Sequence, residues 1–305
     1  MAVIVGIAIF CFIVAMLFYL ADYVAFHKNN QDSENGLKNF GDCKTAKEIG
    51  LKIITIFLFF SIALAIISFL LTNHWVSSYG QKIIKVIMVL VDFGLTYTVV
   101  GYLCNIFRIE RSGDVAMGWF VQIITALLIT LAWVFYPNWL TLDIAAFMLA
   151  LMFLIAFKNI SFKQALAFSV AIMAYDMFMV FGTGVMQKVA SAGVKINIPI
   201  LIVVPDSLSL SANKLFMIGL GDIVLPGLLI MLAFRFARQY HWSTTGLIIR
   251  LCAITGYIIG FFMAIIMAVM FNFGQPATIY LIPGVMLGIL ATVIYKKLLK
   301  ELWNF

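Results

Sequence analysis

The feature that most constrains this chain is a series of apolar stretches, each long enough to cross a lipid bilayer as a helix. Such a helix needs about 20 mostly apolar residues. Hydrophobic residues make up 64% of the 305-residue chain and charged residues only 11%, far outside the range of soluble globular proteins. We therefore predict an all-α polytopic membrane protein with nine transmembrane helices, at residues 2–24, 51–72, 84–107, 118–136, 139–157, 164–186, 214–234, 247–271 and 276–295.

The basic residues between these spans predict the orientation of the chain. Cytosolic loops of membrane proteins carry an excess of Lys and Arg. Fifteen basic residues lie on the side reached after the first, third, fifth, seventh and ninth spans, and five lie on the opposite side. We expect the N-terminus in the lumen or outside the cell and the C-terminus in the cytosol. The same bias accounts for the net charge of +7, so that charge does not indicate a nucleic-acid partner.

Two further features of the sequence concern processing and metals. The first span begins at Met1 without a basic leader, so we expect a retained span, with a cleaved signal peptide as the alternative. The cysteines and histidines are scattered, with no CxxC motif and no ligand spacing. We therefore expect no metal site, no cofactor and no structural disulfide.

The segment between the sixth and seventh spans has a different pattern. The stretch VKINIPILIVVP, from Val194 to Pro205, is too short to span a membrane as a helix and is rich in β-branched residues. Such a run favours extended backbone, so we predict a short extended segment that pairs with another strand. A re-entrant or loop-packing stretch fits the pattern equally well.

Four aspartates fall within or at the edges of the predicted spans. A charge at the centre of a bilayer costs at least about 2.5 kcal/mol and normally indicates function. Asp143 lies early in its span, and Asp92 lies about two helical turns after Lys85. For these two we expect structural roles, in helix packing or, for Asp92, in an ion pair. Asp176 and Asp222 lie deeper in their spans.

Asp176 and Asp222 belong to neighbouring antiparallel spans. Counted from the side that the two spans share, Asp176 is about ten residues in and Asp222 about eight, so at about 1.5 Å per residue their depths are similar. Two carboxylates that face each other cannot both ionise cheaply, so they share a proton. The ionised member can then activate water while the protonated member polarises a carbonyl, as in aspartic proteases.

The residues around Asp222 predict a weakened helix. Gly219 and Gly221 have no side chains, which would let another backbone approach closely, and Pro226 cannot donate the helical hydrogen bond to the Asp222 carbonyl. Transporters also place carboxylates beside broken helices. From these residues alone, a protease and a proton- or cation-coupled transporter fit equally well, although the two halves of the chain show no internal repeat. Zinc and serine proteases are disfavoured because HExxH and GxSxG are absent.

Three short motifs, in order on the sixth, seventh and ninth spans, resemble the signature of the signal peptide peptidase family of presenilin-type intramembrane aspartyl proteases. They are YD at Tyr175 and Asp176, GLGD from Gly219 to Asp222, and QPATIYLIP from Gln275 to Pro283. The resemblance covers at least residues 165–295 and is greater to the signal peptide peptidase branch than to presenilin. It implies that Asp176 and Asp222 are catalytic, supported by Tyr175, Gly219, Gly221, Gln275, Pro276 and Ala277.

The resemblance also implies a fold and a function. It implies a presenilin-like nine-helix fold in which residues 1–163 are a scaffold with a substrate entry and residues 164–305 are the catalytic region. The implied activity is hydrolysis of peptide bonds within type II-oriented transmembrane segments, such as remnant signal peptides, in the endoplasmic reticulum membrane. The expected partners are these substrates and the lipid bilayer, without obligatory subunits or nucleic acid, and a homo-oligomer is compatible with this reading.

One residue departs from the family pattern, because Thr278 stands where the family's PAL motif has Leu. We expect its hydroxyl to bond a backbone carbonyl, with tuning of substrate fit as the alternative. A substrate helix must also unwind before cleavage, since its carbonyls are already hydrogen-bonded. We expect the extended segment to hold the unwound stretch as an added strand, and the candidate substrate-binding residues are Asn197, Ile200, Leu201 and Ile202.

Overall fold

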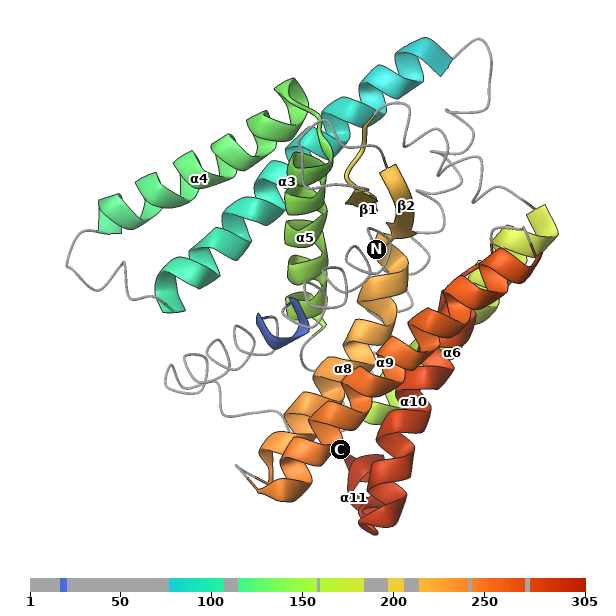
Figure 1. Ribbon diagram of the computed structural model, residues 1–305. Helices are drawn as coiled ribbons and strands as arrows, with labels where there is room; N and C mark the ends of the chain where they lie inside the picture. The colour runs from blue at the N-terminus through green and yellow to red at the C-terminus, as the bar shows by residue number, and fades with distance from the viewer. Residues whose placement is uncertain are drawn as a thin grey trace. The chain divides into compact units, whose positions relative to one another are not determined.

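The computed structural model describes residues 17–20, 77–106, 115–157, 160–183, 197–205, 214–240, 243–271 and 275–305. The chain divides into two compact units. The first comprises residues 1–41, 56–155 and 188–220, and the second comprises residues 42–55, 156–187 and 221–305. Helices make up most of the described residues of both units (Figure 1). The spans predicted at 2–24 and 51–72 lie outside the described residues, apart from residues 17–20.

Three apolar helices form most of the first unit. They are α3 (Ser77–Ile106), α4 (Val115–Phe135) and α5 (Trp139–Ala156). α3 and α4 lie side by side along their lengths (Figure 1). A tight turn joins α4 to α5, and the Oδ1 atom of Asn138 accepts the backbone N–H of Thr141 at 3.0 Å. This side-chain cap replaces a helical bond that the first turn of α5 lacks.

The first unit also contains an antiparallel hairpin of two strands, β1 (Leu201–Pro205) and β2 (Lys214–Gly219). In its register Leu201 lies opposite Gly219 and Val203 lies opposite Met217. The prediction that the seventh span is helical from residue 214 is therefore wrong, because residues 214–219 form a strand and the helix begins at Leu220. Hydropathy does not separate the two, since apolar residues suit a buried strand as well as a membrane helix.

The second unit holds the remaining helices. They are α6 (Phe162–Met177), the π-helix η2 (Phe178–Thr183), α8 (Leu220–Arg238), α9 (Thr244–Phe271), α10 (Thr278–Tyr295) and α11 (Leu299–Asn304). A capping box between Ser161 and Gln164 begins α6. α8 is enclosed, with every residue from Ile223 to Phe234 buried. It continues through Pro226, so the helix is not interrupted at that proline.

α9 and α10 pack backbone against backbone (Figure 1). A Cβ atom added at Gly256 would lie 2.3 Å from the Gly284 carbonyl oxygen, and one at Gly260 would lie 2.6 Å from the Tyr280 carbonyl oxygen. A Cβ at Gly288 would lie 2.2 Å from the Cys252 carbonyl oxygen. Such approach is typical of small residues between membrane helices, where van der Waals packing drives association.

The C-terminal helix α11 joins the ends of two other helices. The Leu302 side chain is fully buried, and the rings of Trp303 and Phe162 lie 6.1 Å apart at the start of α6. Phe305 stacks edge-on against Phe236, near the end of α8, with ring centroids 5.4 Å apart. α11 therefore contacts the first residue of α6 and the last turn of α8. Asp176 and Asp222 lie at the other ends of these two helices.

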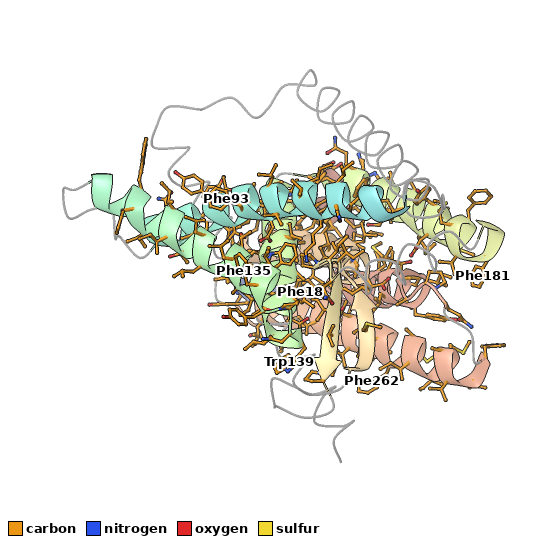
Figure 2. The ribbon with its side chains drawn as sticks, turned by 90° about the horizontal axis from the view of Figure 1, so that it is seen from above. Phe18, Phe93, Phe135, Trp139, Phe181 and Phe262 are labelled. Atoms are coloured by element: carbon orange, nitrogen blue, oxygen red, sulfur yellow. The ribbon has the colours of Figure 1, made fainter. Side chains whose placement is uncertain are left out.

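Seven of the described helical segments are long and apolar enough to cross a membrane. Their surfaces carry many exposed apolar side chains, among them Phe135, Phe181 and Phe262 (Figure 2). In water such a surface would be costly, whereas lipid solvates it. The chain is a multi-pass membrane protein built mostly of helices.

Candidate active site

The first acid of the predicted pair lies where α6 changes its helix type. Asp176 is the second-last residue of α6 and is partly buried. The π-helix η2 begins two residues later at Phe178. π-Helical turns are rare and occur frequently at functional sites. Tyr175, the predicted supporting residue, precedes Asp176 on the same helix and is also partly buried.

The structure joins Asp176 to the start of α10. The Thr278 hydroxyl donates a hydrogen bond to the Asp176 Oδ2 atom at 2.7 Å. Thr278 is the first residue of α10 and is 1% exposed. The expected bond from this hydroxyl to a backbone carbonyl is therefore wrong, because the carboxylate lies within reach and is the better acceptor. Two motifs that are 102 residues apart, YD and QPAT, thus meet in one site.

The residues before Thr278 form a compact helix start. The Gln275 Oε1 atom accepts the Tyr280 hydroxyl at 2.5 Å. Pro276 is buried, and its carbonyl accepts the Ile279 N–H at 3.3 Å. Ala277 has helical dihedral angles and makes no side-chain cap. The positive end of the α10 dipole therefore lies beside Asp176, which favours a negative charge there.

The second acid lies at the beginning of its helix. Asp222 is the third residue of α8, rather than about eight residues into a helical span. It follows β2 directly, since Gly219 is the last residue of that strand and pairs with Leu201. A Cβ atom at Gly221 would meet no described atom within 4 Å, so the close approach predicted at this glycine is not observed.

The candidate substrate-binding residues lie in or just before β1. Leu201 and Ile202 are in the strand, Ile200 accepts the Leu220 N–H at 3.0 Å, and Asn197 has a positive φ of 52°. Leu201 and Ile202 therefore lie on the extended strand, whereas Asn197 and Ile200 lie in the turn that precedes it. All four belong to the first unit, while Asp176, Asp222 and Thr278 belong to the second.

Two other intramembrane acids have contacts that the sequence did not reveal. The Asp143 Oδ1 atom accepts the Val203 N–H at 2.8 Å, which ties α5 to β1. The Asp92 Oδ2 atom accepts the Thr130 hydroxyl and the Trp133 indole N–H, both at 3.0 Å. Both donors belong to α4, so Asp92 joins α3 to α4. These contacts confirm the predicted helix-packing role of Asp92 and not the alternative of an ion pair with Lys85. Only the placement of polar residues in apolar helices signalled these contacts beforehand.

The architecture matches that of a known class of membrane enzymes. The chain resembles the structure of a presenilin family intramembrane aspartate protease, with a TM-score of 0.59 at 18% identity, covering 94% of this chain and 96% of that one. A second structure of a presenilin family protease gives a TM-score of 0.56 at 17% identity. At such low identity the likeness concerns the fold, which is presenilin-like.

The family model described as signal peptide peptidase matches residues 1–305. The chain therefore belongs to the signal peptide peptidase family. This membership confirms the resemblance drawn from the three motifs, and nothing in the comparisons supports the transporter alternative.

Three relatives illustrate the range of similarity. The signal peptide peptidase of Homo sapiens is 38% identical over 113 residues, which cover 36% of this chain and 29% of the relative. Intramembrane protease 2 of Caenorhabditis elegans is 32% identical over 184 residues, 55% of this chain and 38% of the relative. Signal peptide peptidase-like 3 of Oryza sativa subsp. japonica is 29% identical over 204 residues, 63% of this chain and 38% of the relative. The matches thus span well under half of each relative's length.

Proposed function

We propose that this chain is an intramembrane aspartyl protease whose catalytic residues are Asp176 and Asp222. The observation that carries the proposal is the hydrogen bond from Thr278 to Asp176, because it brings a carboxylate of one family motif against another inside membrane-spanning helices. A carboxylate in a membrane-spanning helix is costly, and contact with a second family motif distinguishes Asp176 from Asp92 and Asp143, whose partners lie outside the motifs. Family membership supports the same reading.

The chemistry requires one ionised and one protonated carboxylate. The ionised aspartate removes a proton from water, and the water oxygen bonds to the carbonyl carbon of the substrate peptide. The protonated aspartate polarises the carbonyl oxygen in the same step. When the tetrahedral intermediate breaks down, the C–N bond cleaves, and the leaving nitrogen takes up the proton that the first aspartate removed from water. The carboxylate pair then returns to its singly protonated state.

The substrates, membrane and topology follow from the same proposal. With nine spans and a lumenal N-terminus, the protein would cleave type II-oriented transmembrane segments such as remnant signal peptides in the endoplasmic reticulum membrane. It would need the lipid bilayer but no obligatory subunits, metal or cofactor, and a homo-oligomer is compatible with this activity. The GxGD motif from Gly219 to Asp222 would supply the second acid of an aspartic endopeptidase.

The hairpin supplies a place for an unwound substrate. Within the described residues the sheet has two strands, and the outward N–H of Val203 on β1 is already taken by Asp143. The substrate would therefore add to the other edge, formed by β2. Backbone hydrogen bonds to β2 would satisfy peptide groups that lipid cannot. β2 ends at Gly219, three residues before Asp222 in the chain.

The test uses purified protein in detergent with a fluorogenic transmembrane-helix peptide. Asp176→Asn and Asp222→Asn keep the side-chain shape but remove the carboxylate, so each should lower cleavage by at least about 10³-fold, in line with the loss of an essential acid or base. An aspartyl-protease transition-state analogue should inhibit the wild type. The matched control is Asp92→Asn, because Asp92 is a buried intramembrane acid with its own partners on α4.

Retained cleavage in either active-site variant would contradict the assignment of that residue. Absence of cleavage by folded wild-type protein, together with ion flux in liposomes, would contradict the protease reading as a whole. Loss of activity in Asp92→Asn to the same degree would show that any change of an intramembrane acid is damaging, and the assignment would then fail.

A further inference from the structure

We propose that Thr278 is a positioning residue, which holds the Asp176 carboxylate in its reactive orientation through the hydrogen bond that its hydroxyl donates. The inference rests on the proposed function, since it takes Asp176 as a catalytic acid. It assigns a role to the residue at which this chain departs from the leucine of the family motif. A leucine side chain has no donor and could not make this contact.

The geometry of the contact is that of a strong hydrogen bond. The distance of 2.7 Å between Thr278 Oγ1 and Asp176 Oδ2 is typical of a well-formed O–H···O bond and lies within the range found for hydroxyls that donate to carboxylates. Thr278 is 1% exposed, so solvent does not compete for its hydroxyl. The bond fixes one carboxylate oxygen and therefore restricts rotation of the whole group.

The position of the hydroxyl is itself fixed by helix packing. Thr278 begins α10, and two residues later the Tyr280 carbonyl lies against Gly260 of α9, so closely that an added Cβ would be 2.6 Å away. The first turn of α10 is thus held by main-chain contact with α9. Thr is β-branched and has few χ1 rotamers in a helix. The backbone of α10 therefore determines where the hydroxyl lies.

Asp176 needs such an anchor because its own helix changes there. The N–H of Phe178 bonds to both the Ala174 and the Tyr175 carbonyls, and the backbone then continues as the π-helix η2. A change of helix type alters the direction of the side chains beside it. Contact with the rigid start of α10 sets the carboxylate independently of η2.

A positioning role affects turnover more than substrate binding. Small misplacement of a reacting group costs about 10²-fold in rate, whereas a substrate helix is held by many other contacts. Removal of the hydroxyl should therefore lower kcat and leave KM nearly unchanged. A residue that shaped only the substrate pocket would change KM instead.

The experiment compares four variants with the wild type on the same peptide. Thr278→Val keeps the branched shape without the hydroxyl and should lower kcat by about 10- to 100-fold, with KM within about twofold. Thr278→Ala, also without the hydroxyl, should behave likewise. Thr278→Ser restores the donor and should return kcat to within about threefold of wild type. The control Thr292→Val removes a buried hydroxyl from the same helix, which among the described residues donates to the Gly288 carbonyl, and it should keep the wild-type kcat.

Thermal unfolding is measured for all variants, so that kinetics are compared between folded proteins. Wild-type kcat in Thr278→Val, or a kcat in Thr278→Ser as low as in Thr278→Val, would overturn the inference. So would a change confined to KM. These outcomes differ from failure of the proposed function, in which the wild type itself would not cleave the peptide and Asp176→Asn would change nothing.

Discussion

At the scale of single residues, Gly256 shows how little space separates α9 from α10. A methyl group added there would lie 2.3 Å from the Gly284 carbonyl oxygen and 2.9 Å from its carbonyl carbon. Both atoms belong to the main chain, so no side chain can rotate away. We predict that Gly256→Ala forces the helices apart and lowers the free energy of unfolding by about 1–3 kcal/mol, the usual cost of overpacking.

The measurement is unfolding of purified protein in mixed detergent micelles. Gly94→Ala on α3 is the matched control, because a Cβ there would meet no described atom within 4 Å. This control should be neutral or slightly stabilising, since Ala favours a helix more than Gly. Equal stability of the two variants would contradict the contact between α9 and α10.

The same scale shows which contacts sequence could predict. Asp176 and Asp222 can be singled out from the sequence because a carboxylate in an apolar membrane helix is energetically costly and normally has a function. Their surroundings were less predictable. The Asp143 contact joins residues 60 apart, and the Thr278 contact joins residues 102 apart. Only the packing of distant helices decides which donor reaches a given carboxylate.

At the scale of secondary-structure elements, β2 carries the proposal for substrate binding. Because Leu220 donates to the Ile200 carbonyl and the register pairs Val203 with Met217, the Met217 N–H points away from β1. Met217→Pro removes this outward N–H while leaving the hairpin bonds, as prolines do on edge strands. We predict at least about 10-fold slower cleavage of a transmembrane peptide, because an added substrate strand would lose a backbone partner.

The comparison variant is Met217→Val, which keeps the N–H and suits a strand. It should cleave far faster than Met217→Pro, with both proteins melting at similar temperatures. Deletion of residues 197–204 should abolish cleavage altogether while the protein remains inserted in the membrane. Equal activity of Met217→Pro and Met217→Val would count against strand addition at β2.

Sequence predicted the described helices well and the hairpin less well. The apolar stretches at 118–136, 139–157 and 247–271 correspond closely to α4, α5 and α9, since length and hydropathy suffice for membrane helices. The sequence predicts the start of a helix at β2 because Leu215 to Ile218 are apolar, which suits a membrane helix as well as a strand. The pairing of β2 with β1 depends on a contact that no local pattern contains.

At the scale of the whole molecule, the distribution of charge predicts the orientation of the chain in the membrane. Fifteen of the 20 basic residues lie on one side of the predicted spans, and an excess of Lys and Arg is typical of the cytosolic side. With a lumenal N-terminus and a cytosolic C-terminus, the helices that carry the two acids would have the orientation in the membrane that suits type II-oriented substrates. The turn between α4 and α5 should then be lumenal, and α11 should be cytosolic.

We predict that single cysteines in these two places will react from opposite sides of the membrane. In a background lacking Cys11, Cys43, Cys104 and Cys252, Lys300→Cys should react with a membrane-impermeant maleimide in sealed microsomes, whose outer face is cytosolic. Tyr136→Cys, at a position that is 74% exposed, should react only after detergent opens the vesicles. Both proteins should retain cleavage, which shows that they are folded. The reverse labelling pattern would place the N-terminus in the cytosol, and the acids would then meet substrates of the opposite orientation.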